Sequence, residues 1–189
     1  MIGDAAAHTI DGPATRFLLA LARETIQCRL DGKRLPCPEL SDRNLLEPRG
    51  AFVTLKIDGR LRGCIGHVIG VAPLWRAVRD NAIAAAFEDP RFEPLTAEEL
   101  ALTRIEISAL TPLQRTDSHE IVIGRDGILL ECGRPRGLLL PQVAAEFGWD
   151  RETFLDHTCR KAGLEPGCWR HPDTMISTFS AQVFGEEEL

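Results

Sequence analysis

The segment that most constrains the fold spans residues 51–68 and reads AFVTLKIDGRLRGCIGHV. Apolar and polar side chains alternate along it, which is typical of two β-strands that each bury one face. An Asp-Gly pair between two such runs is a strong signal for the turn of a β-hairpin. We therefore predict a hairpin over this segment, with its turn around Asp58-Gly59.

The alternation also selects a register for this hairpin. A two-residue loop would pair Leu55 with Arg62, which mixes apolar and charged side chains on one face. A three-residue loop, residues 57–59, pairs Leu55 with Leu61 and keeps the two kinds of side chain apart. We predict this second register and expect its polar face to border a cleft. That face would hold Phe52, Thr54, Lys56, Arg60, Arg62 and Cys64.

The rest of the chain mixes helical and strand patterns. Helices are predicted at residues 14–30, 73–88, 141–147 and 150–163, and a capping box opens a short helix after Thr96. Strands are predicted at residues 103–110, 137–140 and 174–184, with a second hairpin around Asp126-Gly127. Residues 31–50 carry three prolines and are predicted as a loop. This order indicates the α+β class with mainly antiparallel sheets packed with helices.

Each half of the chain is predicted to contain a hairpin, a helix and a strand in that order. The two Asp-Gly pairs are 68 residues apart, and so are Pro73 and Pro141. An internal duplication would explain these matching intervals. Coincidence would explain them as well, because Asp-Gly turns are common. Both interpretations stay open on the sequence alone.

The composition is that of an ordinary globular domain. The 189 residues are 44% hydrophobic and 26% charged, which suits one domain or two lobes that share a core. No apolar run approaches the ~20 residues that a membrane-spanning helix needs, and the first residues lack the pattern of a signal peptide. We expect a cytoplasmic protein that does not bind membranes. Its formal net charge of −6 disfavours broad binding to duplex nucleic acid.

The six cysteines predict thiols rather than disulfides or a metal site. Cytoplasmic cysteines generally stay reduced, and the chain contains no Cys-x-x-Cys pair. The nearest approach to a zinc pattern joins His157, Cys159, Cys168 and His171. Residues at positions i and i+2 of a helix point apart, however, so His157 and Cys159 would not converge on one ion. We expect no metal site, and the sequence does not indicate a cofactor.

Cys64 is the candidate reactive group. In the predicted strand, Arg62 lies on the same face with its Cα about 6.5 Å from that of Cys64. A cation at this distance favours the thiolate, which is the nucleophilic form of cysteine. Lys56 and Arg60 on the same face would strengthen the field. Gly63 and Gly66 would let another backbone or a ligand approach closely.

A structural role for Cys64 stays open beside the chemical one. Free cysteine is among the most often buried residue types, and glycines next to it can simply relieve crowding. The segment also provides no partner base. His67 follows three residues later and would face the opposite side of a continuous strand.

Several segments together resemble the AMMECR domain family, also called AmmeMemoRadiSam system protein A. The most specific are LRGCIG at residues 61–66, NAIAAAFEDPRFEPLTAEEL at 81–100 and IEISALTP at 105–112. IGRDGILLE, GLLLPQVAAE and FLDHTCRKAGL add to the resemblance further along the chain. Because the resemblance covers residues 15–185, we expect residues 1–189 to form a single AMMECR domain, with two lobes possible.

The resemblance implies an α+β fold in two unequal lobes, with a cleft lined by residues 61–66. It implies a shared pathway with a Memo-type protein and a radical-SAM protein, but it names no reaction, and the biochemical activity of the family is not established. The residues that match the family motifs are Arg62, Gly63, Cys64, Gly66, Asn81, Asp89, Arg91, Phe92 and Glu106.

Two functions follow as alternatives. In an enzyme or enzyme subunit, Cys64 is the nucleophile or redox group, Arg62 its electrostatic activator and Glu106 an acid or base. In a non-catalytic binding module, the same cleft holds a partner protein, an anionic ligand or RNA. The candidate binding residues are Lys56, Arg60, Gly63, Gly66, Asn81, Asp89 and Arg91.

Some of these residues also have purely structural interpretations. Asn81 can satisfy a buried backbone group, and Asp89 before Pro90 can simply end a helix. Arg91 and Glu106 can form a structural ion pair.

Overall fold

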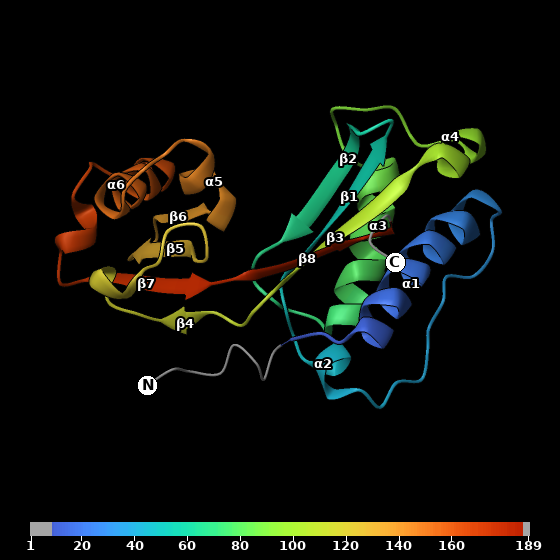
Figure 1. Cartoon of the computed structure of the whole chain (residues 1–189), viewed down its shortest axis with the longest axis horizontal. Helices are drawn as coiled ribbons and strands as arrows, with labels where there is room; N and C mark the ends of the chain where they lie inside the picture. The colour runs from blue at the N-terminus through green and yellow to red at the C-terminus, as the bar shows by residue number, and fades with distance from the viewer. Residues whose placement is uncertain (1–8, 187–189) are drawn as a thin grey trace. The chain divides into compact units, whose positions relative to one another are not determined.

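The computed structural model describes residues 9–186 and divides the chain into two compact units (Figure 1). The large unit consists of residues 1–110 together with 182–189, and the small unit of residues 111–181. Each unit is built from antiparallel strand pairs and helices, as the sequence predicts for the α+β class.

The large unit contains a four-stranded sheet in the order β2-β1-β3-β8. Its strands are β1 (Ala51–Ile57), β2 (Arg60–His67), β3 (Arg104–Leu110) and β8 (Ala181–Gly185). The strand β1 pairs antiparallel with both β2 and β3. One face of the sheet packs against two helices, α1 (Gly12–Leu30) and α3 (Leu74–Phe87), and forms the core with them. The opposite face, which we call the outer face, carries the polar side chains of these strands.

Local sequence signals set the helix boundaries in this unit. Asp11 caps α1 by accepting a hydrogen bond from the Ala14 N–H, and α3 follows Pro73 as predicted. The expected capping box of Thr96 and Glu99 opens α4 (Ala97–Leu102). The predicted loop over residues 31–50 is interrupted by one helical turn, α2 (Arg43–Leu46).

The turn of the β1–β2 hairpin has two residues rather than three. Asp58 and Gly59 both have positive φ, at 50° and 73°, and Ile57 pairs with Arg60. Two consecutive residues of this kind form the tight turn whose twist matches that of the flanking strands. The predicted three-residue loop is therefore wrong.

A β-bulge then shifts the pairing beyond the turn. It lies opposite Leu55 and Lys56 and makes Arg62 the extra residue. Leu55 consequently pairs with Gly63 and not with Leu61, which corrects the predicted register. Leu61 leaves the apolar face and is 42% exposed. The bulge thus keeps Gly63 on the core face, although a two-residue turn alone would have turned it outward.

The small unit contains a four-stranded sheet in the order β4-β7-β5-β6. Its strands are β4 (Gln114–Arg115), β5 (Gly127–Cys132), β6 (Arg136–Leu139) and β7 (Thr174–Phe179). Its helices are η2 (Ser118–Glu120), α5 (Pro141–Glu146), α6 (Arg151–Lys161) and η3 (Cys168–Arg170). Side chains of β5, α6 and β7 meet in a core around Ile128, Phe154 and Ile176.

Two predicted elements of the small unit differ from the structure. The hairpin is β5–β6, with its turn at Gly133, and Asp126 instead closes a turn by accepting the Val122 N–H. The predicted closing strand is two strands, because the chain breaks at Ser180 between β7 and β8. These two strands belong to different sheets.

The two segments that join the units are hydrogen-bonded to each other. The Thr111 N–H donates to the Ser180 carbonyl oxygen at 2.9 Å, and the Ser180 N–H donates to Thr111 Oγ1 at 2.9 Å. The first segment follows β3 and the second precedes β8, which are neighbours in the sheet of the large unit. Within residues 9–186, no helix combines the length and apolar content needed to cross a bilayer.

Candidate functional site

The candidate residues Cys64 and Glu106 lie on the outer face of the large unit's sheet, on either side of Thr54. Thr54 of β1 pairs with Cys64 of β2 on one side and with Glu106 of β3 on the other. The three residues therefore form a row across three adjacent strands. Strands in a sheet are about 4.8 Å apart, so the backbones of Cys64 and Glu106 are about 10 Å apart.

The thiol of Cys64 is partly exposed and accepts a hydrogen bond. Its donor is Thr54 Oγ1, at 3.3 Å from Sγ. A hydroxyl in this position stabilises negative charge on the sulfur, because hydrogen bonds to ionised acceptors are stronger than those to neutral ones.

The backbone of Cys64 is held by the segment that follows α3. Because β2 is an edge strand, its outward N–H and C=O groups need partners other than a neighbouring strand. Asp89 Oδ2 accepts the Cys64 N–H at 2.9 Å, and Arg91 Nη2 donates to the Cys64 carbonyl at 3.2 Å. Two side chains thus fix the position of Cys64 at the edge of the sheet.

Asp89 is the strongly perturbed group of this arrangement. Its side chain is only 2% exposed and accepts bonds from Arg91 Nε at 2.9 Å and Nη2 at 2.7 Å. These bonds, together with that from the Cys64 N–H, hold the pKa of Asp89 far below its usual range, although burial acts in the opposite direction. The carboxylate therefore stays charged at neutral pH.

Arg62 is bound by a carboxylate. Its Nε and Nη2 each donate to one oxygen of Glu99, both at 2.9 Å, and Nη2 also donates to the Glu93 carbonyl. The side chain is 13% exposed and lies 5.7 Å from the centre of the Phe92 ring. The same bond lowers the pKa of Glu99. Because Glu99 compensates its charge, Arg62 acts as a tie between β2 and α4.

The two glycines of the motif have packing reasons within the unit. A Cβ atom on Gly63 would overlap the carbonyl oxygen of Ala85, so glycine lets α3 lie close to β2. A Cβ atom on Gly66 would overlap the ring of Phe52. Both glycines therefore permit close approach by other parts of the same chain.

Asn81 lies on the core side of the sheet rather than on the outer face. Its Nδ2 donates to the Ala51 carbonyl at 3.0 Å, as expected for a residue that satisfies a buried backbone group. Its Oδ1 is 3.2 Å from Nδ1 of His67. Because an amide oxygen only accepts, His67 carries a proton on Nδ1. His67 thus faces α3 while Cys64 faces Thr54, so the two do not form a Cys-His pair.

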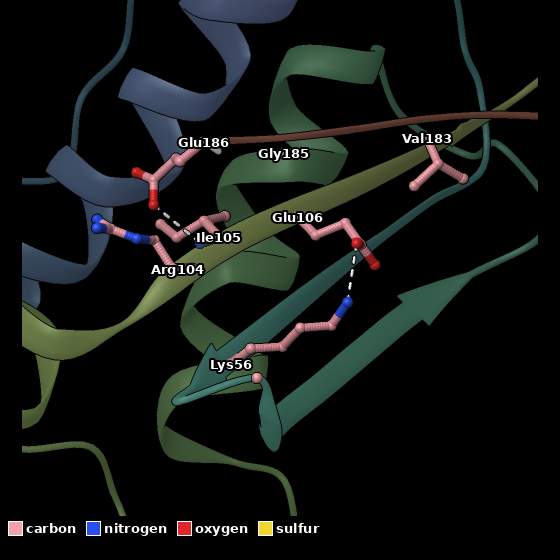
Figure 2. A pocket seen from close by; sticks show the side chains of 8 residues that line it. Lys56, Arg104, Ile105, Glu106, Val183, Gly185 and Glu186 are labelled. Atoms are coloured by element: carbon pink, nitrogen blue, oxygen red, sulfur yellow. Dashed lines mark hydrogen bonds and ion pairs between the residues drawn. The ribbon is translucent and has the colours of Figure 1, made fainter. Parts of the chain in front are cut away.

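The ion pair suggested for Arg91 and Glu106 is not formed between these two residues. Arg91 binds Asp89, whereas Glu106 Oε2 accepts a bond from Lys56 Nζ at 2.9 Å. Lys56 and Glu106 point toward one another across the outer face (Figure 2). Arg60, at the start of β2, is exposed.

A cavity of about 240 Å³ adjoins the Lys56–Glu106 pair (Figure 2). Its wall comes from the β1–β2 turn, β3 and the end of β8. The lining residues are Lys56, Gly59, Arg104, Ile105, Glu106, Val183, Gly185 and Glu186. Cys64 does not line it, so the thiol and the cavity are linked only by the row through Thr54 and Glu106.

Comparison with known proteins shows which family the chain belongs to. The sequence model of the AMMECR1 family matches residues 19–184. The chain belongs to the AMMECR1 family. It is 44% identical over 183 residues to protein TK0174 of Thermococcus kodakarensis, covering 90% of this chain and 89% of that one. It is 45% identical over 180 residues to a protein of Methanothermobacter thermautotrophicus, covering 91% and 94%.

A solved structure extends the likeness to the fold. The crystal structure of uncharacterized protein PH0010 from Pyrococcus horikoshii matches with a TM-score of 0.75 at 43% identity, covering 90% of each chain. The names of these relatives state no reaction. The family is therefore established, while the activity of this AMMECR1-family chain has to be argued from its own residues.

Sequence reasoning missed the contact partners at the site. The alternation places Thr54 on the face of Cys64 without indicating a role for it, and the spacing of Glu99 from Thr96 indicates only a capping box. Glu99 in fact serves both Thr96 and Arg62. Glu186 belongs to the acidic segment 185–189, whose charge predicts a solvated tail. This prediction is wrong for Glu186, which accepts the Ile105 N–H and binds Arg23 beside the cavity.

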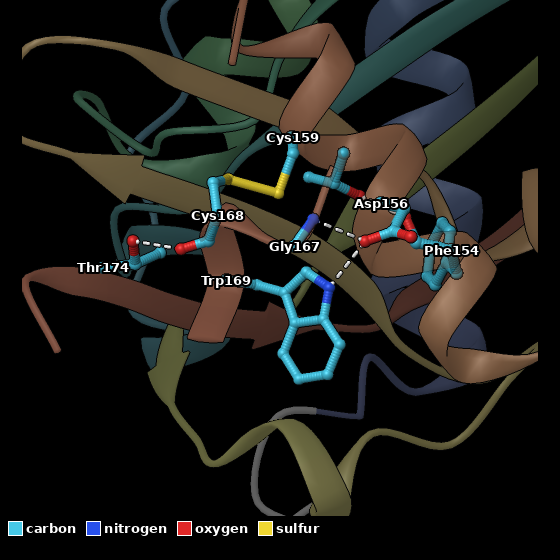
Figure 3. The surroundings of a disulfide bond; sticks show 8 residues. Phe154, Asp156, Cys159, Gly167, Cys168, Trp169 and Thr174 are labelled. Carbon is cyan, nitrogen blue, oxygen red and sulfur yellow. Dashed lines mark hydrogen bonds between the residues drawn. A yellow bond between two sulfur atoms is a disulfide. The ribbon is translucent and has the colours of Figure 1, made fainter. Parts of the chain in front are cut away.

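The cysteine and histidine cluster of the small unit forms a disulfide instead of a metal site. Cys159 of α6 is bonded to Cys168, with their Cα atoms 6.1 Å apart (Figure 3). The expectation that all cysteines are thiols is therefore wrong for this pair. His157 stacks on Trp149 at 3.8 Å. Among the described residues, no group of three or more His, Cys, Asp or Glu side chains could hold a metal ion.

Asp156 organises the segment between the two bonded cysteines. Its Oδ1 accepts the Gly167 N–H and the Trp169 Nε1–H, both at 2.8 Å (Figure 3). Gly167 adopts a positive φ of 84°, which lets the chain turn back toward α6 and places Cys168 opposite Cys159.

Proposed function

We propose that this AMMECR1-family chain is an enzyme or enzyme subunit in which Cys64 reacts with a small ligand on the outer face of the large unit. The observation that carries the proposal is the hydrogen bond from Thr54 Oγ1 to a partly exposed Cys64 Sγ whose backbone is fixed on both sides. Fixed position and a donor aimed at the sulfur are what a thiolate nucleophile needs.

The two neighbouring carboxylates, Asp89 and Glu106, differ in their suitability as acceptors of the thiol proton. Asp89 lies closest to Cys64, but its depressed pKa makes it a weak proton acceptor near neutral pH. Glu106, one strand beyond Thr54, is the candidate acceptor of the thiol proton. Because the backbones of Cys64 and Glu106 are about 10 Å apart, the proton would pass through the Thr54 hydroxyl or a water. Arg62 has its charge compensated by Glu99 and supports the site by holding β2. Arg91 is compensated by Asp89 in the same way and holds the Cys64 carbonyl, so the group that acts on the sulfur itself is the Thr54 hydroxyl.

The family resemblance supports the further proposal that the reaction belongs to a pathway shared with Memo-type and radical-SAM proteins. An affinity purification of the tagged chain from its native host tests this step. Recovery of either protein class with wild type, and with the Cys64→Ser variant, would support a shared assembly.

A binding module without catalysis is the second candidate. The engagement of Glu106 by Lys56 favours it, because the carboxylate that would serve as base is already paired. In this alternative the outer face holds a partner protein, an anionic ligand or RNA, and Cys64 is a packing residue.

The rate at which Cys64 is alkylated distinguishes the two candidates. We expect Cys64 to react with iodoacetamide at pH 7 faster than Cys37, although Cys37 is the more exposed thiol. Thr54→Val should slow Cys64 severalfold, whereas Thr54→Ser, which keeps the hydroxyl, should not. Mass spectrometry of the labelled peptides reports both rates. A Cys64 that reacts more slowly than Cys37 and ignores Thr54→Val would support the binding module.

A further inference from the structure

We infer that the cavity beside the Lys56–Glu106 pair binds a small zwitterion of the α-amino acid type, with its ammonium group on Glu106 and its carboxylate on Lys56. The inference rests on the proposed function, since it names the class of ligand for the same face. It depends on the charges that line the cavity, on the size of the cavity and on its place beside the row formed by Cys64, Thr54 and Glu106, which we call the Cys64 row.

The charges that line the cavity are of both signs. Lys56 and Arg104 supply two cations, and Glu106 and Glu186 supply two carboxylates. Glu186 is fixed in the wall, because Arg23 binds both of its oxygens at 2.6 Å and one of them also accepts the Ile105 N–H.

The Lys56–Glu106 pair is the part of this wall that a ligand can reach and open. Its side chains are 37% and 35% exposed, and the two groups lie 2.9 Å apart across neighbouring strands. An ion pair this exposed contributes little to stability, so its separation by a ligand costs little free energy.

Charge balance selects a zwitterion over a simple anion or cation. A ligand with one charge can make a charged hydrogen bond to only one member of the pair and leaves the other to water, whereas a zwitterion can make one to each. A ligand with an ammonium and a carboxylate group replaces both partners at once. The total charge of the lining and the ligand then stays unchanged.

The dimensions of the cavity suit a ligand of this kind. Water occupies about 30 Å³ per molecule in the liquid, so a cavity of about 240 Å³ holds on the order of eight non-hydrogen atoms. Gly59 and Gly185 leave room at its edge because they carry no side chains. Val183, which is 53% exposed, offers an apolar contact for a small side chain.

The bound ligand would lie next to the Cys64 row. Its ammonium group on Glu106 would be one strand away from Thr54, which donates to Cys64 Sγ. The cavity would then supply recognition while the row supplies the reacting sulfur.

Titration of the ¹⁵N-labelled protein tests the inference. L-Alanine and L-serine serve as zwitterions, and propionate and ethylamine as matched ligands with a single charge. We expect saturable shifts of the amide signals of residues 104–106 and 183–186 with the zwitterions, and at least tenfold weaker binding of the singly charged compounds. Absence of saturable shifts, or equal binding by propionate, overturns the inference.

Variants of the pair sharpen the result. Lys56→Met and Glu106→Gln should each weaken L-alanine binding at least tenfold, and circular dichroism verifies that both are folded. Lys33→Met is the matched control, because it breaks an exposed Lys33–Asp31 pair of similar length, 2.8 Å, just after the end of α1. An equal effect of Lys33→Met would overturn the inference.

Cys64→Ser separates this inference from the proposed chemistry. The variant should bind L-alanine as tightly as wild type, because Cys64 does not line the cavity. If the protein binds L-alanine but its Cys64 is unreactive, the zwitterion site is supported and the proposed enzyme is contradicted. A reactive Cys64 in a protein that binds no zwitterion would overturn the zwitterion site alone.

Discussion

Gly63 and Gly137 occupy equivalent places in the two units. Each lies in the second strand of its hairpin, opposite a leucine of the first strand. A Cβ atom would collide with a helix carbonyl oxygen at both positions, that of Ala85 in α3 or of Thr158 in α6. The strand orders β2-β1-β3 and β6-β5-β7 match as well, so the two units share one way of bringing a helix against a hairpin.

The residues around the two glycines differ, and the difference locates the site. Arg62, which precedes Gly63, is 13% exposed at a bulge and binds Glu99. Arg136, which precedes Gly137, is 59% exposed and binds Glu131 across its hairpin. The shared Arg-Gly pair therefore has a packing role in both units, whereas in the large unit it lies at a bulge and is followed directly by a cysteine.

The first strands of the two hairpins show the same contrast. Buried and partly exposed positions alternate along β1, whereas the first four residues of β5 are all buried. Of the two first strands, only β1 thus presents polar side chains on one face while it packs with the other. The topology is common to both units, and their first strands differ in how they are buried.

Replacing Asp89 with Ala should produce the largest difference in stability between the two units. The change removes the acceptor of the Cys64 N–H and the partner of Arg91. Because a charged network is left incomplete, we expect the large unit to lose about 3 kcal/mol of unfolding free energy. Hydrogen exchange should accelerate in residues 60–67 and stay unchanged in residues 111–181. Equal acceleration in both units would show that they do not respond independently.

Loss of the disulfide should affect the other unit. Cys159 and Cys168 are nine residues apart in sequence, and a loop of this size stabilises by about 2.5 kcal/mol in the chain-entropy model. Cys159→Ser should therefore destabilise the small unit by about this amount, while Cys132→Ser, which removes a free thiol, serves as control. Tryptophan fluorescence in a Trp75→Phe background follows the small unit. An unchanged midpoint of denaturation would contradict the prediction.

The two glycines allow a direct test of their equivalence. Gly63→Ala and Gly137→Ala should each cost about 1–3 kcal/mol, because a backbone carbonyl cannot move aside as a side chain can. Each effect should stay within its own unit in hydrogen exchange. Gly12→Ala in α1 is the control and should be neutral or slightly stabilising, since only the end of Arg16 lies near its Cβ position. A harmless Gly137→Ala would break the equivalence.

The smallest expected effect is on acid stability. The pKa of Asp89 is depressed in the folded chain, so its contribution is complete above the unfolded value of about 3.9 and is lost as the pH falls below it. The free energy of unfolding of the large unit, measured by urea denaturation, should therefore fall as the pH is lowered below about 4. Asp89→Asn should flatten this dependence. The same slope in the variant would assign the acid sensitivity to other carboxylates.

The sequence predicted those elements whose signals are local. The helix α3, the capping box before α4 and the strand β3 depend on neighbours a few residues away, and all three are confirmed. The turn at Asp58-Gly59 was placed correctly, but its length was not. A bulge can restore the sorting of faces after a two-residue turn, so the pattern alone does not distinguish the two registers.

The parts of the site that were not predicted depend on distant residues. The partner of Arg62 is Glu99, 37 residues away, and that of Cys64 N–H is Asp89, 25 residues away. The disulfide was missed because the turn at Gly167 brings Cys168 back to α6, and no spacing rule shows such a return. The functional roles of the candidate residues remain predictions, which the labelling and titration experiments test.

The hydrogen bonds between Thr111 and Ser180 indicate that the small unit is an insertion into the sequence of the large unit. They hold the entry and exit of the small unit side by side, so the whole of residues 112–179 is a loop insertion between two adjacent strands, β3 and β8. An insertion with neighbouring ends can be removed or exchanged without rethreading its host. The large unit, with a short linker in place of these residues, is therefore the natural minimal scaffold on which to study Cys64.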